Sequence, residues 1–338
     1  MLDDRKRKVL QAIVEEYINT AEPVSSNALI TKYDLQCSSA TIRNEMADLE
    51  KRGLLDKMHT SSGRIPSAKG YRYYVDELLK DDNISLEEVK YISDKLETKV
   101  NEIEDLTKIT ANTISEITHY TTVTIGPKAS EQIITEIKFV LLGSRMLLAV
   151  IMTDIGMVKE TIIKFDEDIT EKQVETINYM FNNKLKNRPI GTIDKPLEEY
   201  LYQEMSDMVK VIKPIIEQIK KVLFEDEEIH LQGTRRELDL PEFNSLQVAK
   251  NFMNILDEKE LIADMLNSGF AKDINVYIGG EDEKEELKDF SVVTFKHKIG
   301  NKDMGTIGII GPKRMDYSKV ISVMKYISKK LNQEKEDK

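Results

Sequence analysis

Residues 38–52 read Ser38-Ser-Ala-Thr-Ile-Arg-Asn-Glu-Met-Ala-Asp-Leu-Glu-Lys-Arg52. The apolar side chains of Ile42, Met46 and Leu49 are spaced four and three residues apart, which places them on one face of a helix. The predicted helix begins at the paired serines 38 and 39 and runs to Arg52, and Gly53 is a typical C-terminal stop. The stretch therefore predicts an amphipathic helix with an apolar inner face.

The outer face of this predicted helix carries side chains that suit nucleic acid, namely Ser39, Thr41, Arg43, Asn44, Lys51 and Arg52. Arginine pairs with guanine, asparagine with adenine, and serine or threonine with either kind of base edge. The plain alternative is an ordinary amphipathic helix with a solvated outer face. DNA binding is favoured because the hydroxyl, arginine and asparagine groups gather in the first half, where a recognition helix meets bases. We expect Ser39, Thr41, Arg43 and Asn44 at or near bases and Lys51 on a phosphate.

The surrounding segments complete a small first domain over residues 1–80. An apolar stripe from Val9 to Ile18 predicts a first helix that ends before Pro23, and residues 25–33 predict a second. Residues 54–66 predict a hairpin, and Ser67 can cap a further helix that runs to about Leu79. The order helix, helix, helix, hairpin, helix contains a helix-turn-helix arrangement.

The predicted hairpin tip, His59-Thr-Ser-Ser-Gly-Arg64, is polar and cationic. A simple turn would need only the Ser-Gly pair, whereas hydroxyls, backbone N–H groups and an arginine can hold the sugar-phosphate backbone or enter the minor groove. We therefore expect contacts from His59, Ser61, Ser62 and Arg64, with Lys69 and Arg72 on phosphates.

Four cations, Arg5-Lys-Arg-Lys8, lie in the first turn of the first predicted helix, where they oppose the helix dipole. A nearby phosphate would explain this placement. Capping and charge compensation by Asp3 and Asp4 would explain it equally well.

Charge is unevenly distributed over the 338 residues, whose net charge is -11. Taken alone, this value argues against DNA, which binds basic surfaces. However, residues 1–80 hold 13 Lys and Arg against 12 Asp and Glu, and residues 43–72 hold seven against four. The acidity belongs to the remainder of the chain, so the predicted DNA-binding face is locally cationic.

Other classes of protein find little support. The sequence contains no GxSxG, HExxH, Walker A or Rossmann glycine motif, and its four histidines show no metal-ligand spacing. We therefore expect no enzyme, no metal and no cofactor. The single cysteine, Cys37, excludes a disulfide framework, and the most apolar run, residues 139–152, is too short to span a bilayer. We expect a cytoplasmic protein without a membrane partner.

The rest of the chain alternates between helix and strand patterns. Residues 85–119 predict a long amphipathic helix, which either packs along its own domain or also joins domains or subunits. Strand patterns follow at 121–125, 133–142, 145–153 and 157–163, and the last three form a meander. Helices are predicted next at 170–187 and 196–224, and Pro214 marks a kink or a break in the second. Further strands are predicted at 228–232, 274–278, 290–297 and 304–310, helices at 245–256 and 259–266, and a final helix at 317–331.

Several of these stretches resemble the HrcA family of bacterial heat-inducible transcription repressors. The matching segments are VSSNALITKYDL, SSATIRNEMADLEKRGLL and HTSSGRIPSAKGYRYYVDELL near the start, GTRRELDLPEF at 233–243, and YIGGEDEKEELKDFSVVTFKHKIGNKDMGTIGIIGPKRMDYSKVI at 277–321. The resemblance covers nearly the whole chain in order, with its densest motifs at both ends.

The resemblance implies an α+β multidomain protein. Residues 1–80 would form a winged helix-turn-helix domain, residues 85–130 and 227–334 a GAF-like α/β domain, and residues 131–226 an inserted α+β dimerisation domain. It also implies a homodimer that binds an inverted-repeat, CIRCE-type DNA operator in chaperone operons, with the GroE chaperonin maintaining its activity. Neither catalysis nor a cofactor is implied.

This sequence departs from the family pattern at three places: Cys37 replaces a usual apolar residue, Met58 a common proline, and Asp282 an asparagine. The first two should leave DNA binding intact, because a buried thiol can serve as a small apolar group. Two other hypotheses stay open: a small-molecule sensor in the GAF-like region, and a winged helix fused to an enzyme, which the missing catalytic motifs disfavour.

Overall fold

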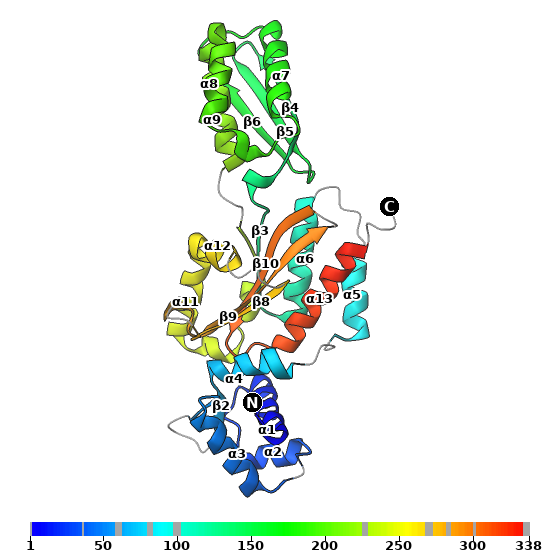
Figure 1. Ribbon diagram of the computed structural model, residues 1–338, viewed down its shortest axis with the longest axis vertical. Coiled ribbons are helices and arrows are strands. Elements are labelled where there is room, and N and C mark those ends of the chain that lie inside the picture. Colours follow the sequence, from blue (N-terminus) through cyan, green and yellow to red (C-terminus); the bar gives the residue numbers. More distant parts are fainter. Residues whose placement is uncertain are drawn as a thin grey trace.

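The computed structural model describes residues 2–35, 37–57, 63–79, 84–96, 103–224, 229–267, 273–281, 285–299 and 302–333. Its secondary structure forms three bodies stacked along one long axis (Figure 1). We call them the N-terminal unit (residues 2–79), the central unit (84–125 and 229–333) and the inserted unit (134–224). Together they make a mixed α+β chain, as the sequence predicts.

The N-terminal unit contains the predicted order of elements. These are α1 (Asp4–Thr20), α2 (Ser26–Lys32), α3 (Ser39–Lys51), β1 (Leu55–Lys57), β2 (Arg64–Pro66) and α4 (Ala68–Tyr73). Strands β1 and β2 are antiparallel, with Leu55 opposite Pro66, and Val24 forms an additional bridge to Arg64. The predicted last helix starts at its Ser67 cap but continues beyond α4 as a π-helical turn, Tyr74–Leu78.

The central unit is built on an antiparallel sheet in the order β7-β3-β10-β9-β8. Its strands are β3 (Thr121–Ile125), β7 (Ile229–Gln232), β8 (Ile274–Ile278), β9 (Phe290–Ile299) and β10 (Lys302–Pro312). One face packs on α5 (Leu86–Leu96), α6 (Ile103–Thr118) and α13 (Tyr317–Gln333). The other packs on α11 (Leu246–Asp257) and α12 (Lys259–Asn267), and α10 (Thr234–Glu237) follows β7. All the strands predicted in this region are present.

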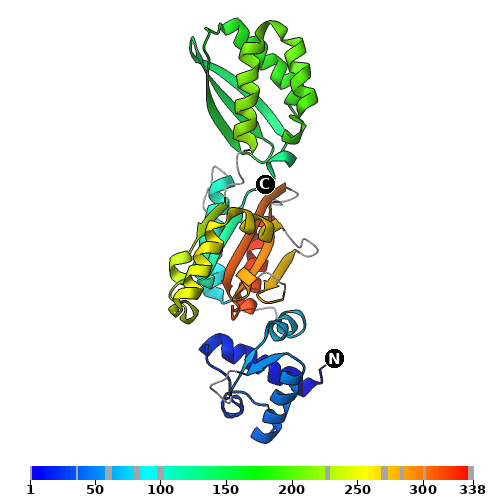
Figure 2. The same cartoon turned by 90° about the vertical axis from the view of Figure 1, so that its left-hand side faces the viewer.

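The inserted unit leaves the central sheet after β3 and returns to it at β7, which pairs with β3. It contains the predicted meander, β4 (Ile134–Gly143), β5 (Met146–Thr153) and β6 (Val158–Lys164). Helices α7 (Glu171–Leu185), α8 (Lys195–Glu204) and α9 (Val209–Phe224) cover one side of this sheet, as both views show (Figure 2).

Two predictions about helices in the chain were wrong. The segment 85–119 is not one long helix, because α5 and α6 pack side by side within the central unit. The predicted helix 196–224 is interrupted at Met205–Met208, and the break predicted at Pro214 is absent, because Pro214 lies inside α9.

The buried side chains show how the three bodies are joined. A single apolar core runs from α1 and α3 of the N-terminal unit into β8, β9 and α13 of the central unit. The inserted unit has a core of its own. It meets the central unit through a small cluster in which Ile155 and Met157, from the β5–β6 turn, approach Leu106 and Met304. The N-terminal and central units are therefore one packed body, with the inserted unit attached to it.

Candidate nucleic-acid interface

Helix α3 has the inner face that its sequence predicts. Ile42, Met46 and Leu49 are all buried in the core shared with α1. The helix begins where the sequence predicts, and the Ser38 hydroxyl caps it by accepting a hydrogen bond from the backbone N–H of Thr41 at 3.1 Å. Gly53 follows the helix with a φ of +72°, a left-handed conformation that glycine adopts without strain. Local sequence signals thus fix both ends of α3.

Polar contacts fix α3 relative to α2. The Ser39 hydroxyl donates to Oδ1 of Asn27 at 2.9 Å and lies 3.1 Å from the Ser26 hydroxyl. Both partners lie in the first turn of α2, so Ser39 connects the two helices across the connecting turn. Its hydroxyl is thus partly occupied within the protein, which the sequence did not indicate.

The exposed side of α3 presents Arg43, Asn44 and Lys51 to solvent. None of these three has a hydrogen-bond or ion-pair partner among the residues that the structure describes. Thr41, one turn nearer the N-terminus, is half-buried, and its hydroxyl lies 2.9 Å from that of Ser38. An unpaired guanidinium and an unpaired carboxamide on adjacent positions can form the bidentate contacts that base edges accept.

The β1–β2 hairpin follows α3 directly and is tied to it by Arg64. Its guanidinium Nε donates to Oε2 of Glu50 in α3 at 2.7 Å, and its side chain is 17% exposed. Arg64 therefore has a structural role, and the prediction that it grips DNA is not supported. His59, Ser61 and Ser62 at the hairpin tip lie outside the described residues, so their predicted contacts stay predictions.

The two cations predicted on phosphates beyond the hairpin differ in their surroundings. Lys69 is exposed, and its Nζ donates to the carbonyl of Arg52, just past the end of α3, at 3.1 Å. Arg72 instead pairs with Glu281 of the central unit, at 2.7 Å and 2.5 Å. Arg72 is thus paired within the protein, which argues against its predicted phosphate contact. No local signal in the sequence links two residues so far apart.

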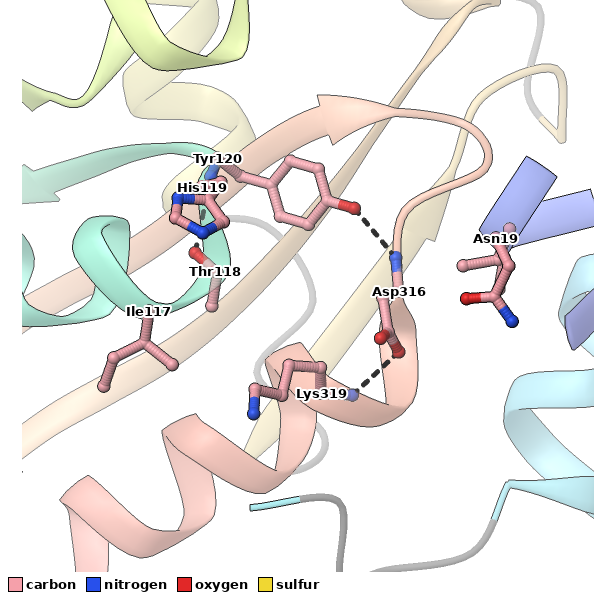
Figure 3. Close-up of a pocket in the computed structure, with 8 residues that line it drawn as sticks. Asn19, Ile117, Thr118, His119, Tyr120, Asp316 and Lys319 are labelled. Carbon is pink, nitrogen blue, oxygen red and sulfur yellow. Dashed lines mark hydrogen bonds between the residues drawn. The ribbon is translucent and has the colours of Figure 1, made fainter. Parts of the chain in front are cut away.

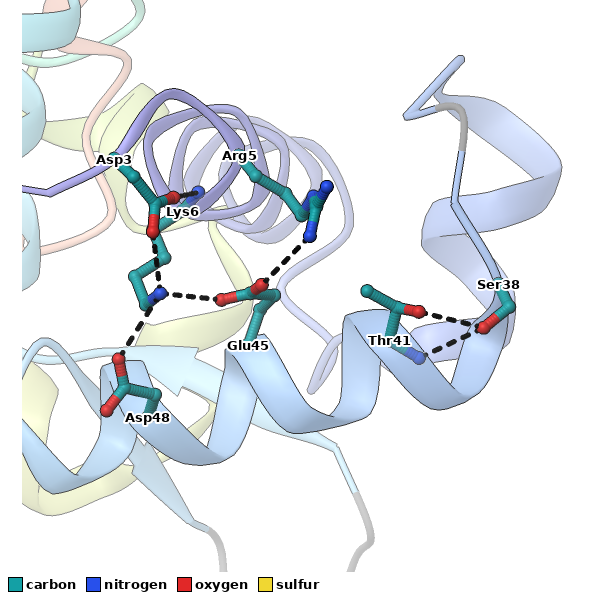
Figure 4. Close-up of polar contacts among 7 residues, drawn as sticks. All are labelled: Asp3, Arg5, Lys6, Ser38, Thr41, Glu45 and Asp48. Atoms are coloured by element: carbon teal, nitrogen blue, oxygen red, sulfur yellow. Dashed lines mark hydrogen bonds and ion pairs between the residues drawn. The ribbon is translucent and has the colours of Figure 1, made fainter.

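Acidic side chains surround the cations at the start of α1 (Figure 4). Asp3 caps the helix, and the Lys6 ammonium lies 2.8 Å from Asp3, 3.0 Å from Glu45 and 3.5 Å from Asp48. These carboxylates raise the pKa of Lys6, with the hydrogen bond to Asp3 the largest cause. Of the two explanations for the basic start of α1, compensation by Asp3 accounts for Lys6, and the contacts with Glu45 and Asp48 also fasten α1 to α3.

A shallow hollow of about 430 Å³ lies at the junction of α1, the end of α6 and the start of α13 (Figure 3). Its lining includes Asn19, His119, Asp316 and Lys319. The Tyr120 hydroxyl accepts from the backbone N–H of Asp316 at 3.0 Å, which links the end of α6 to the start of α13. Within the described ranges, no cluster of histidine, cysteine and acidic residues could hold a metal ion.

Two buried ionisable side chains of the central unit were not singled out from the sequence. Burial raises the pKa of Glu237 to about 8, although its Oε2 accepts from the backbone N–H of Thr121 at 2.7 Å. Burial lowers the pKa of His297 to about 4, and neither ring nitrogen has a hydrogen-bond partner. Both groups are therefore mainly uncharged at neutral pH. Neither lies in the N-terminal unit, so they bear on stability rather than on the candidate interface.

Comparison with known proteins shows what kind of protein carries this arrangement. The family model of the HrcA protein C-terminal domain matches residues 104–321. A heat-inducible transcription repressor HrcA of Ruminiclostridium cellulolyticum is 39% identical over 99% of this chain and 97% of its own length. That of Acetivibrio thermocellus is 37% identical over 98% of this chain and 96% of its own.

These relatives define the class as transcription repressors, which act by binding DNA. Within that class, the chain belongs to the HrcA family of heat-inducible transcription repressors. The crystal structure of a hypothetical protein at 2.2 Å resolution is similar in fold, with a TM-score of 0.64 and 26% identity over 98% of both chains. No helix in the described part of the chain is long and apolar enough to cross a membrane.

Proposed function

We propose that this chain represses chaperone operons by binding an inverted-repeat, CIRCE-type operator as a homodimer. In this proposal the N-terminal unit is a winged helix-turn-helix domain, with α3 as the recognition helix and the β1–β2 hairpin as the wing. The observation that carries the proposal is the exposed, unpaired face of α3 with Arg43 and Asn44. Family membership supports the same role.

The proposed contact surface follows from which side chains are available. Arg43, Asn44 and Thr41 would contact bases, with Ser39 beside them, and Lys51 and Lys69 would contact phosphates. His59, Ser61 and Ser62 would contact DNA from the wing. Arg64 and Arg72 do not belong to this surface, because each guanidinium already has a carboxylate partner.

The proposed domain limits are 1–80 for the winged helix, 85–130 with 227–334 for the GAF-like domain, and 131–226 for the inserted dimerisation domain. The pairing of β3 with β7 supports the insertion, because the chain leaves and re-enters the central sheet on neighbouring strands. The separate core of residues 134–224 supports it independently.

The open side of the inserted sheet is the proposed dimer surface. The apolar side chains exposed on it are Val140, Leu142, Met146, Met152, Val158 and Ile162. Val140, Leu148 and Ile162 form one cross-strand row, and Lys138, Val150 and Glu160 form the next. The apolar faces of α7 and α9 are buried in the inserted core, so the open sheet side is the apolar surface that a second copy can cover. A second copy would cover this apolar strip and could pair Lys138 with Glu160 across the two-fold axis.

Substitution of Ile162 tests the dimer surface. Ile162 is 53% exposed, so Ile162→Asp should leave the fold intact while placing a charge on the apolar strip. Sedimentation velocity should then show a monomer. The matched control is Tyr179→Asp, because Tyr179 is 70% exposed on α7, away from the open sheet side. A variant that stays dimeric at Ile162 would refute the surface.

DNA footprinting tests the function itself. The purified chain should protect a symmetric site in the chaperone promoters of its own organism, and added GroE chaperonin should strengthen that protection. Protection of one half-site alone would argue against the dimer, and protection unaffected by chaperonin would argue against the proposed modulation. We place the protein in the cytoplasm, where it would meet both DNA and chaperonin.

A further inference from the structure

The junction between the N-terminal and central units is packed rather than flexible. Tyr71 of α4 and Tyr317 of α13 are both fully buried, with ring centroids 5.7 Å apart. The Tyr317 hydroxyl lies 2.7 Å from the Ser291 hydroxyl on β9 and donates to the carbonyl of Lys313 at 2.7 Å. One aromatic ring from each unit therefore sits in the shared core, and the polar contacts of Tyr317 fix its position.

Arg72 crosses this junction from the N-terminal unit. Its Nε and Nη2 donate to the two carboxylate oxygens of Glu281 at 2.7 Å and 2.5 Å, and Nη2 also donates to the carbonyl of Val276 on β8 at 2.6 Å. Glu281 is in turn positioned by the backbone N–H of Ile278, which donates to its Oε2 at 3.2 Å. A bidentate guanidinium–carboxylate pair of this kind fixes orientation as well as distance.

Arg314 crosses the same junction in the opposite direction. This side chain of the central unit donates from Nη1 to the carbonyl of Ile18, near the end of α1, at 2.6 Å. Its Nε and Nη2 donate to Glu242, the latter at 3.2 Å, and the Arg314 side chain is only 12% exposed. The two arginines thus hold different helices of the N-terminal unit, α4 and α1.

We propose that Arg72 with Glu281, and Arg314 with Glu242 and Ile18, form a two-arginine clamp that sets the operator spacing the repressor accepts. Two separated attachments prevent the N-terminal unit from rotating about a single contact. In a dimer, the clamp would therefore fix the distance and angle between the two α3 helices. The inference rests on the proposed function, because it needs two copies that bind two half-sites.

The clamp predicts a dependence on spacing that a merely structural ion pair would not produce. A dimer with rigidly held recognition helices accepts one half-site separation and rejects sites displaced around the DNA helix. Loosening the clamp lets each N-terminal unit change its orientation to match a displaced half-site. The affinity for the natural operator then falls, and the loss of affinity for operators with altered spacing becomes smaller. Binding to an isolated half-site should not change, since α3 itself is untouched.

The experiment compares Glu281→Gln and Arg72→Gln with the unmodified full-length chain. Glu198→Gln is the matched control, because Glu198 pairs with Lys220 at 2.5 Å on the helical side of the inserted unit, away from the junction. Fluorescence anisotropy at one salt concentration measures affinity for the natural inverted repeat, for repeats with a spacer changed by about half a turn, and for one half-site. Hydrogen exchange of α4 reports directly whether the junction has loosened.

We expect each clamp variant to bind the natural operator about fivefold more weakly than the unmodified chain. The ratio of its affinities for the natural and the altered spacers should also be about fivefold smaller. Half-site affinity and the control variant should be unchanged. Faster exchange in α4 with unaltered spacer discrimination would overturn the clamp, as would tighter binding to the natural operator. Failure of the unmodified chain to prefer any inverted repeat would refute the proposed function instead.

Discussion

Replacing Gly70 by alanine puts two physical effects in direct opposition. Gly70 lies in α4, and alanine in a helix interior is normally favoured over glycine by about 1 kcal/mol. However, a Cβ added at Gly70 would lie 2.1 Å from the carbonyl oxygen of Leu54, whereas ordinary contact begins at 3.4 Å. The sign of the change in unfolding free energy therefore reveals which effect dominates.

The structure indicates that the clash dominates. Leu54 cannot retreat easily, because its N–H donates to the carbonyl of Leu49 at 3.0 Å and its own carbonyl accepts from the N–H of Ser67 at 3.2 Å. Overpacking a buried site costs about 1–3 kcal/mol, and such a fixed backbone neighbour places this site near 3. After the gain in helix propensity, we expect Gly70→Ala to lose about 2 kcal/mol.

Hydrogen exchange measured by mass spectrometry suits a chain of three units, because it reports local opening. Peptides from α3, the β1–β2 hairpin and α4 should exchange about 30-fold faster in Gly70→Ala, and peptides of the inserted unit should not change. The control is Gly53→Ala. A Cβ there meets nothing within 4 Å, so only the strain of its +72° φ remains, at about 1 kcal/mol. Unchanged or slower exchange in Gly70→Ala would refute the reasoning.

Three other predictions follow from single side chains. Arg43→Ala should weaken operator binding by at least tenfold in a gel-shift titration, because each half-site loses a contact worth about 1–3 kcal/mol. The thermal midpoint of the variant should stay constant, because Arg43 is exposed. Near-normal operator affinity would remove Arg43 from the interface. Burial holds the folded-state pKa of His297 at about 4, so the chain should lose stability as pH falls below about 6.5, and His297→Phe should flatten that loss in thermal scans. Burial raises the folded-state pKa of Glu237 to about 8, so the stability of the chain should fall as pH rises from about 4.5 to about 8. If Glu237→Gln shows the same loss of thermal stability over this pH range, the assignment is contradicted.

Local patterns in the sequence were enough to predict the N-terminal unit and the meander. The spacing of Ile42, Met46 and Leu49 follows the helical repeat, and Ser38 and Gly53 mark the two ends by capping and by backbone conformation. The strands of the inserted unit alternate over most of their length between more buried and more exposed side chains, and tight turns separate them. These signals lie within a few residues of the feature they predict.

What escaped prediction depends on contacts between distant residues. Arg72 has the character of a phosphate ligand, and only the fold brings it to Glu281. Arg64 likewise meets Glu50, fourteen positions earlier, once α3 and β2 are packed. The apolar spacing is found in both α5 and α6, because each helix turns an apolar face to the same core. Periodicity alone cannot show that these are two helices packed against each other.

The continuous core of the N-terminal and central units has a consequence for how the molecule responds to heat. Segments that share a core lose their structure in one cooperative transition, whereas a segment with a core of its own can melt separately. We therefore expect calorimetry to resolve two events, one for the inserted unit and one for everything else. The surface formed by α3 would then disappear over the same few degrees as the central sheet, so that a rise in temperature acts on this chain as an all-or-none change rather than a gradual one.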